Sequence, residues 1–123
     1  FNILSTSAKQ PMKNMCLSNM TRSCISSWAK TLSKEVASSG INVYNILPDV
    51  IQTERLNNLL EKKAINKNDT VENVIKMIAE DTPVGRIGKP KDVADLVCFL
   101  STEKGSFITG VSIQVDGGRL AVC

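Results

Sequence analysis

Apolar residues recur every three or four positions across residues 14–39, a spacing typical of an amphipathic helix. The recurring positions are Leu17, Met20, Cys24, Trp28, Leu32 and Val36, with Ile25 and Ala29 beside them. Gly40 follows at the point where a left-handed residue commonly ends a helix. We expect this helix to turn its apolar side, including Cys24, toward a core.

Three shorter segments have the patterns of β-strands. Residues 1–4 resemble the end of a strand, and residues 41–47 are rich in β-branched side chains before Pro48 stops them. Residues 111–116 alternate apolar and polar side chains, as a strand with two different faces does. Because the chain begins inside a strand, we expect it to be a piece of a longer protein.

Three further helices are predicted between the second and third strands. One spans residues 54–65, and the next begins at Asp69, which has Glu72 three residues later in a capping-box spacing. The last begins at Pro90, because proline is favoured in the first turn of a helix. Strands that alternate with helices form a parallel sheet covered on both faces. We therefore predict an α/β fold whose few strands are too few to close a sheet alone.

Composition narrows the class of protein. Of the 123 residues, 42% are hydrophobic and 22% are charged, which suits one domain or part of one. The net charge of +3 is small and spread along the chain, so we expect no nucleic-acid partner. No apolar run approaches the ~20 residues that a membrane span needs, so we expect no membrane partner.

The absence of histidine removes several kinds of site. With no His, the chain has no Ser-His-Asp triad, no Cys-His pair and no zinc site built on imidazole. The four cysteines contain no C-x-x-C pair, so no metal site is predicted. They are typical of reduced thiols in a cytoplasmic protein, and the apolar pattern around Cys98 predicts that it is buried.

A few polar residues converge on one end of the predicted sheet. The sequence has no G-x-G-x-x-G and no Walker loop. Ser5 follows the first strand, and Ser18 and Arg22, four residues apart, share one face of the long helix. Pro48 and Thr53 follow a strand whose carboxyl end is where ligands bind in open α/β sheets. On spacing alone, an alternative is that Ser5 is a loop residue, Ser18 a helix-start residue and Arg22 a surface charge.

Several stretches together resemble the C-terminal half of a short-chain dehydrogenase/reductase, in the style of the 3-oxoacyl-carrier-protein reductases. They are Asn-Ile-Leu-Ser at 2–5, Ala-Lys-Thr-Leu-Ser-Lys-Glu-Val-Ala at 29–37, Gly-Ile-Asn-Val at 40–43, the segment 48–53, Pro-Val-Gly-Arg-Ile-Gly-Lys-Pro at 83–90, Phe-Ile-Thr-Gly at 107–110 and Val-Asp-Gly-Gly at 115–118. The resemblance covers nearly the whole chain. It implies that residues 1–123 are a single partial domain, the C-terminal part of a Rossmann-type doubly wound parallel sheet.

The resemblance also implies roles for individual residues. Ser5 stands where the family has the serine that hydrogen-bonds the substrate carbonyl or hydroxyl. Pro48, Ile51 and Thr53 match the segment that touches the nicotinamide carboxamide. Asp49 replaces the usual glycine of that segment, so its backbone is expected to differ. NAD or NADP would be bound mainly by an N-terminal half that precedes this chain.

The largest departure from the family is at its catalytic pair. The family has a tyrosine thirteen residues after the serine and a lysine four residues later; these positions hold Ser18 and Arg22. A Ser hydroxyl is a much weaker acid than a phenol and reaches less far. Arg22 can bind the cofactor ribose with its fork of donors, but it cannot relay a proton at neutral pH. The only tyrosine, Tyr44, lies within a predicted strand and is expected to be buried.

The implied function is that of an oxidoreductase, as part of a longer parent chain. Hydride would pass between the nicotinamide cofactor and a carbonyl or alcohol substrate, with a weakened proton-transfer site at Ser18 and Arg22. The alternatives are a catalytically inactive relative that serves as a cofactor-binding or oligomerisation module, and a non-functional fragment. In this family the long helix packs on its copy, so a homodimer or homotetramer is implied. Residues 61–68 resemble the mobile substrate loop, or are a plain surface helix.

Overall fold

The computed structural model describes residues 1–122 as helices packed on a parallel sheet. In these residues the sheet has three strands, β1 (Asn2–Ile3), β2 (Tyr44–Pro48) and β3 (Val111–Val115), in the order β1-β2-β3. Asn2 pairs with Asn45, and Tyr44 through Pro48 pair with Val111 through Val115. The parallel pairing and the α/β architecture agree with the prediction, and so does the small size of the sheet.

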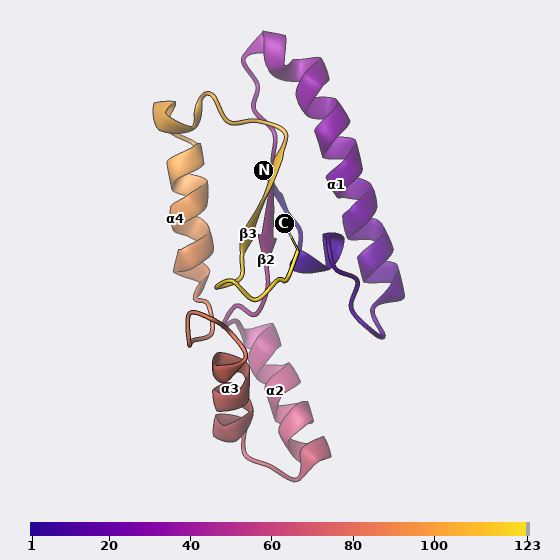
Figure 1. The fold of residues 1–123 in the computed structure, drawn as a ribbon, viewed down its shortest axis with the longest axis vertical. Helices are drawn as coiled ribbons and strands as arrows, with labels where there is room; N and C mark the ends of the chain where they lie inside the picture. Colours follow the sequence, from indigo (N-terminus) through magenta and orange to yellow (C-terminus); the bar gives the residue numbers. More distant parts are fainter. Residues whose placement is uncertain (123) are drawn as a thin grey trace.

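Two helices cover opposite faces of the sheet, as Figure 1 shows. Helix α1 (Cys16–Val36) connects β1 to β2 and lies along one face. Helix α4 (Pro90–Leu100) precedes β3 and lies along the other face. Both crossings are long because parallel strands cannot be joined by a tight hairpin.

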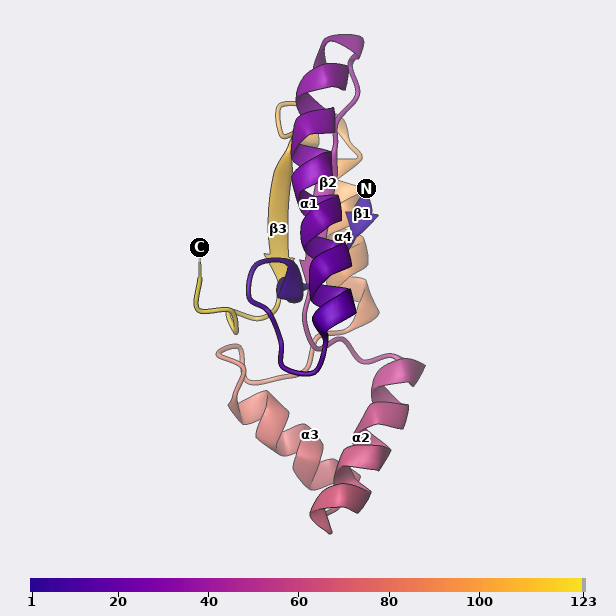
Figure 2. The same cartoon turned by 90° about the vertical axis from the view of Figure 1, so that its right-hand side faces the viewer.

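Helices α2 (Glu54–Lys67) and α3 (Val71–Glu80) form a pair beyond the carboxyl end of β2 (Figures 1 and 2). They pack on each other through a small cluster of buried side chains, Leu60, Ala64 and Val74. The segment predicted as either a loop or a surface helix, residues 61–68, is helical through Lys67 and ends at the left-handed Asn68.

The main apolar core lies between the sheet and α4. Tyr44, Ile46 and Leu100 are buried there, and the apolar side chains of α4 and β3 pack around them. Tyr44 is therefore a packing residue, as expected, and its hydroxyl donates toward the carbonyl oxygens of Leu100 and Gly105, at 3.3 and 3.0 Å.

The face of α1 that contacts the sheet differs from the predicted one. Its buried residues are Ala29 and Ser33, whereas Leu17, Met20 and Trp28 of the apolar repeat are 74%, 55% and 56% exposed. The reason is the surface opposite: β2 and β3 present Asn45 and Ser112 to this helix, and small or polar residues match them. Cys24 and Cys98 are exposed as well, so the prediction that they are buried is wrong.

The helix ends agree with the sequence prediction except at the start of α3. Gly40 adopts φ 73° and ends the short 3-10 turn after α1, and α4 begins at Pro90, both as predicted. Helix α3, however, is capped by Thr70, whose hydroxyl accepts a hydrogen bond from Asn73 N, rather than by Asp69. Asp69 accepts from Thr70 N and Asn73 Nδ2 instead, and these bonds lower the pKa of its carboxyl group. Among residues 1–122, no helix is long and apolar enough to cross a membrane.

Candidate functional site

The carboxyl end of β1 carries Ser5 into a short helical turn. Ser5 has extended backbone angles, and its hydroxyl accepts a hydrogen bond from Ser7 N at 3.2 Å, which caps the turn Thr6–Ala8. The side chain is half-buried. This cap holds Ser5 at the end of the sheet where parallel α/β folds bind ligands.

Ser18 and Arg22 lie beside this turn and contact each other. Arg22 Nε donates to Ser18 Oγ at 3.1 Å, so the two side chains share a helix face as predicted. The Arg22 guanidinium also donates to the carbonyl oxygen of Leu4, the residue before Ser5. One guanidinium therefore ties the first turns of α1 to the end of β1 and brings Ser5, Ser18 and Arg22 into one neighbourhood.

The loop after β2 is bound to the same region through Asp49. Its carboxylate accepts a hydrogen bond from Thr6 Oγ1 at 3.1 Å, so the segments after β1 and β2 are joined directly. The φ of Asp49 does not lie in the left-handed region that would favour glycine. The expected backbone difference therefore does not take that form, and the substitution adds a side chain to an ordinary conformation.

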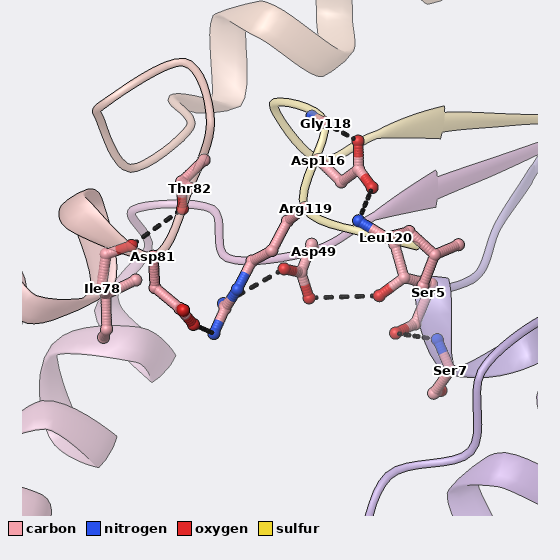
Figure 3. Close-up of polar contacts among 11 residues, drawn as sticks. Ser5, Ser7, Asp49, Ile78, Asp81, Thr82, Asp116, Gly118, Arg119 and Leu120 are labelled. Carbon is pink, nitrogen blue, oxygen red and sulfur yellow. Dashed lines mark hydrogen bonds and ion pairs between the residues drawn. The ribbon is translucent and has the colours of Figure 1, made fainter. Parts of the chain in front are cut away.

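Arg119 is a site residue that the sequence analysis missed. It donates to Asp49 Oδ2 at 3.2 Å and to Asp81 Oδ2 at 3.0 Å (Figure 3). The Asp49 side chain is only 11% exposed, whereas that of Asp81 is 70% exposed, so the first contact is the better shielded. The unusual carboxylate at position 49 was the available signal, because a nearly buried charge needs a partner.

A tight turn after β3 places Arg119. Asp116 accepts hydrogen bonds from Gly118 N at 3.0 Å and from Leu120 N at 2.8 Å, as Figure 3 shows. Gly117 and Gly118 have positive φ angles of 67° and 83°, which side chains rarely adopt. The turn directs the chain back toward Asp49, so segments following all three strands meet at this end of the sheet.

The three residues predicted to contact the cofactor after β2 differ in how close they lie to Asp49. Only Pro48 adjoins it, whereas Ile51 and Thr53 make contacts of their own. Pro48 is the last residue of β2 and pairs with Val115, directly before Asp49. Thr53 caps α2, with Leu56 N donating to its hydroxyl at 3.3 Å. Ile51 forms a parallel bridge with Gly88, and its neighbours Val50 and Gln52 make the hydrogen bonds of that bridge.

The bridge leaves one useful pair of backbone groups on Ile51. In a parallel bridge of this kind, the N–H and C=O of the central residue point away from the partner strand. Ile51 therefore presents a donor and an acceptor on its other side, which is the complement of a primary amide.

The segment that holds this bridge is itself fixed by an ion pair. Arg86 donates to both oxygens of Asp92 at 2.7 and 2.9 Å, and Lys89 N donates to the same carboxylate. These contacts keep the pKa of Asp92 well below its ordinary range. They border a hollow of about 320 Å³ at the ends of β2 and β3. Asp92 therefore stays ionised at neutral pH, and its ion pair with Arg86 holds this segment in place.

Comparison with known proteins places the chain in a family. The family model described as enoyl-(acyl carrier protein) reductase matches residues 1–119. The chain is 33% identical to the 3-oxoacyl-[acyl-carrier-protein] reductase FabG of Rickettsia felis, over 98% of this chain and 44% of that protein. It is 32% identical to the NADPH-dependent reductase BacG of Bacillus subtilis, over 97% of this chain and 46% of the relative.

A solved structure agrees with these sequence matches. L-sorbose reductase from Gluconobacter frateurii, complexed with NADPH and L-sorbose, superimposes with a TM-score of 0.90 at 26% identity. The match covers 98% of this chain and 46% of that one, so this chain spans less than half the length of the relatives it matches. On the family match and the shared fold, the chain belongs to the short-chain dehydrogenase/reductase family.

Proposed function

We propose that residues 1–123 are the C-terminal half of an oxidoreductase domain that transfers hydride between a nicotinamide cofactor and a carbonyl or alcohol carbon. One observation carries the proposal: Arg22 bonds both Ser18 and the residue before Ser5. Ser5, Ser18 and Arg22 therefore stand together at the carboxyl ends of the strands, where the resemblance requires the reacting groups.

NAD or NADP is the proposed cofactor, and two features of this chain fit it. The N–H and C=O of Ile51 suit the nicotinamide carboxamide, with Pro48 and Thr53 at either end of the same loop. Arg22 keeps N–H groups beyond the two that bond Ser18 and Leu4, and these suit ribose hydroxyls. The cofactor, when bound, supplies or accepts the hydride.

Proton transfer is the step of the proposed reaction that these residues support least. Ser5 Oγ would hold the substrate oxygen. Ser18 stands where the family has the tyrosine that transfers the proton. The Arg22 N–H that points at Ser18 Oγ favours negative charge there, but it cannot bring an aliphatic hydroxyl near neutral pKa. Losing general acid–base help slows a reaction by roughly 10²- to 10⁴-fold. We expect slow turnover.

A catalytically inactive relative is the second candidate, and the same guanidinium favours it. Arg22 donates to the Leu4 carbonyl oxygen and so fastens α1 to the end of β1, a structural role that needs no chemistry. In that case the chain would serve as a cofactor-binding or oligomerisation module.

The test uses the full-length parent protein. Cofactor binding is measured by NAD(P)H fluorescence, and turnover is measured with a panel of carbonyls and alcohols. Binding with slow turnover supports the oxidoreductase, and binding without turnover supports the inactive relative. A folded parent that binds neither NADH nor NADPH would contradict the oxidoreductase and would leave, of the second candidate, only the oligomerisation module.

Restoring the family's pair sharpens this test. The double variant Ser18→Tyr with Arg22→Lys is expected to raise the turnover of the parent, because it supplies a phenol and the ammonium group that lowers its pKa. Arg55→Lys, on the exposed side of α2, is the matched control for the cation change. If the double variant has no effect, our assignment of Ser18 and Arg22 is wrong.

We also propose a homodimer or homotetramer in the cytoplasm. The exposed apolar residues of α1, which include Leu17, Met20 and Trp28, support an assembly through this helix. Exposed, unpaired cysteines at positions 16, 24 and 98 suit a reducing compartment. Size-exclusion chromatography of the parent tests the assembly. The remaining alternative is a non-functional fragment, and circular dichroism of residues 1–123 alone tests whether they fold without the rest of the parent.

A further inference from the structure

A hollow of about 480 Å³ opens between the segment after β1 and the C-terminal segment. Its walls come from four parts of the chain and include Thr6, Lys13, Asp49, Lys63 and Arg119. A volume of this order suits a small molecule. The hollow is distinct from the one beside Arg86 and Asp92, with which it shares only the residues at the start of the loop after β2.

The hollow begins next to the proposed reacting group. Thr6 directly follows Ser5, and its hydroxyl donates to Asp49, which directly follows Pro48. A substrate whose oxygen is held by Ser5 would therefore lie close to this hollow, because Thr6 is one of its lining residues. Met12, Val50 and Leu120 supply apolar wall for a carbon skeleton.

The charges on the walls do not balance. The lining residues include three cationic side chains, Lys13, Lys63 and Arg119, and one carboxylate, that of Asp49. Both oxygens of Asp49 are engaged, one by Thr6 and the other by Arg119, while Arg119 also reaches Asp81 outside the hollow. Neither Lys13 nor Lys63 forms an ion pair with any residue between 1 and 122. Among residues 1–122, both lysines therefore line the hollow without an ion-pair partner, and Lys63 also borders the neighbouring hollow that Glu80 and Asp81 line.

We propose that this hollow receives the substrate and that Lys13 and Lys63 bind an anionic substituent on it, a carboxylate or a phosphate. The inference rests on the proposed oxidoreductase function and names its substrate class as small anionic carbonyl or hydroxy compounds. Two lysines are suited to this because an ammonium group binds either anion without demanding the planar geometry that arginine prefers.

The first experiment compares matched substrates with the full-length parent and its preferred cofactor. The pairs are acetoacetate with methyl acetoacetate, and dihydroxyacetone phosphate with dihydroxyacetone. We expect a higher kcat/KM for the anionic member of at least one pair, and the pair that shows it distinguishes carboxylate from phosphate. Raising the salt concentration is expected to reduce this preference, because exposed charges are screened.

Charge-removing variants then test the two lysines. Lys13→Gln and Lys63→Gln are each expected to lower the anionic-to-neutral ratio of kcat/KM by roughly 3- to 10-fold, the size of one partly exposed charge contact. Lys104→Gln is the matched control, because Lys104 lies in the turn before β3, at the amino ends of the strands. A ratio that is unchanged in both variants, or that falls equally in the control, would overturn the inference.

A binding measurement separates this inference from the proposed function. Calorimetry with acetoacetate and with inorganic phosphate reports anion binding without any turnover. Binding that weakens in both lysine variants supports the anion site even if the parent proves inactive. Turnover of neutral and anionic carbonyls at equal kcat/KM, with no anion binding, would overturn the anion site and leave the oxidoreductase standing.

Discussion

On the α4 side of the sheet, Tyr44, Ile46 and Leu100 form an apolar core, whereas on the α1 side the strands present Asn2, Asn45 and Ser112. The α4 side gains stability from removing apolar area from water. The α1 side is held by directional hydrogen bonds, and Asn45 also donates to the Ser26 carbonyl oxygen of α1 at 3.4 Å. The comparison indicates that apolar packing dominates the α4 side, whereas on the α1 side hydrogen bonds accompany the buried Leu47 and help to fix where the helix with Ser18 and Arg22 sits.

Truncating the apolar side is expected to have the largest effect. Ile46 is 0% exposed, so Ile46→Ala should lower the free energy of unfolding by about 2–5 kcal/mol, measured by urea denaturation. Ile65, which is 77% exposed, provides the control, and Ile65→Ala should change it by no more than ~0.5 kcal/mol. Equal effects at the two positions would contradict the idea that the core lies under α4.

Removing hydrogen bonds on the α1 side should lower the free energy of unfolding by less, but it should also loosen the helix that carries Ser18 and Arg22. Asn45 accepts from Asn2 Nδ2 at 2.9 Å and donates to Ser112 Oγ at 3.1 Å, so Asn45→Ala removes both hydrogen bonds. We expect a loss of about 1–3 kcal/mol in the free energy of unfolding and faster amide exchange in α1. If amide exchange in α1 is unchanged, the polar network does not position that helix.

Removing the single hydroxyl of the apolar core should have a smaller effect. Tyr44→Phe keeps the ring, which stacks on Phe1 with centroids 4.8 Å apart, and removes only the donor to the Leu100 and Gly105 carbonyls. The expected loss is about 1 kcal/mol in the free energy of unfolding. A loss as large as that of Ile46→Ala would mean that this side, too, depends on hydrogen bonds.

The smallest effect is expected at the start of α4, and it depends on pH. Arg86 and Lys89 N keep the pKa of Asp92 below its unfolded value, so the carboxylate stabilises the fold above about pH 4. This contribution is lost as the pH falls through the folded-state pKa. Asp92→Asn should therefore be less stable than the parent at pH 7, and the difference in Tm should shrink toward strong acid. A constant difference would show that charge plays no part.

The sequence predicted the order of the elements well and the buried face of α1 badly. Gly40 and Pro90 specify helix ends through backbone geometry, which neighbours along the chain determine. Which side of α1 is buried depends instead on Asn45 and Ser112, which are far away in sequence. An apolar repeat shows that a helix has an apolar side, but it does not say which surface covers that side.

The same distinction between contacts that are local in sequence and contacts that are distant applies to the candidate site. The spacing of Ser18 and Arg22 predicted a shared face, and their hydrogen bond confirms it. The contact between Asp49 and Arg119 spans 70 positions and belongs to no motif, so no local pattern could predict it. The assignment of the site residues to catalysis and cofactor binding stays a prediction.

Gly110 has a consequence for how this architecture can change. A methyl group there would lie 2.4 Å from Ser33 Oγ, and the φ of 65° already disfavours any side chain. Helix α1 is thus clamped near one end against Gly110 and near the other by Arg22 at Leu4. A substitution at Gly110 is therefore expected to displace α1. Because Ser18 belongs to the same helix, its position would change although no residue near it is replaced.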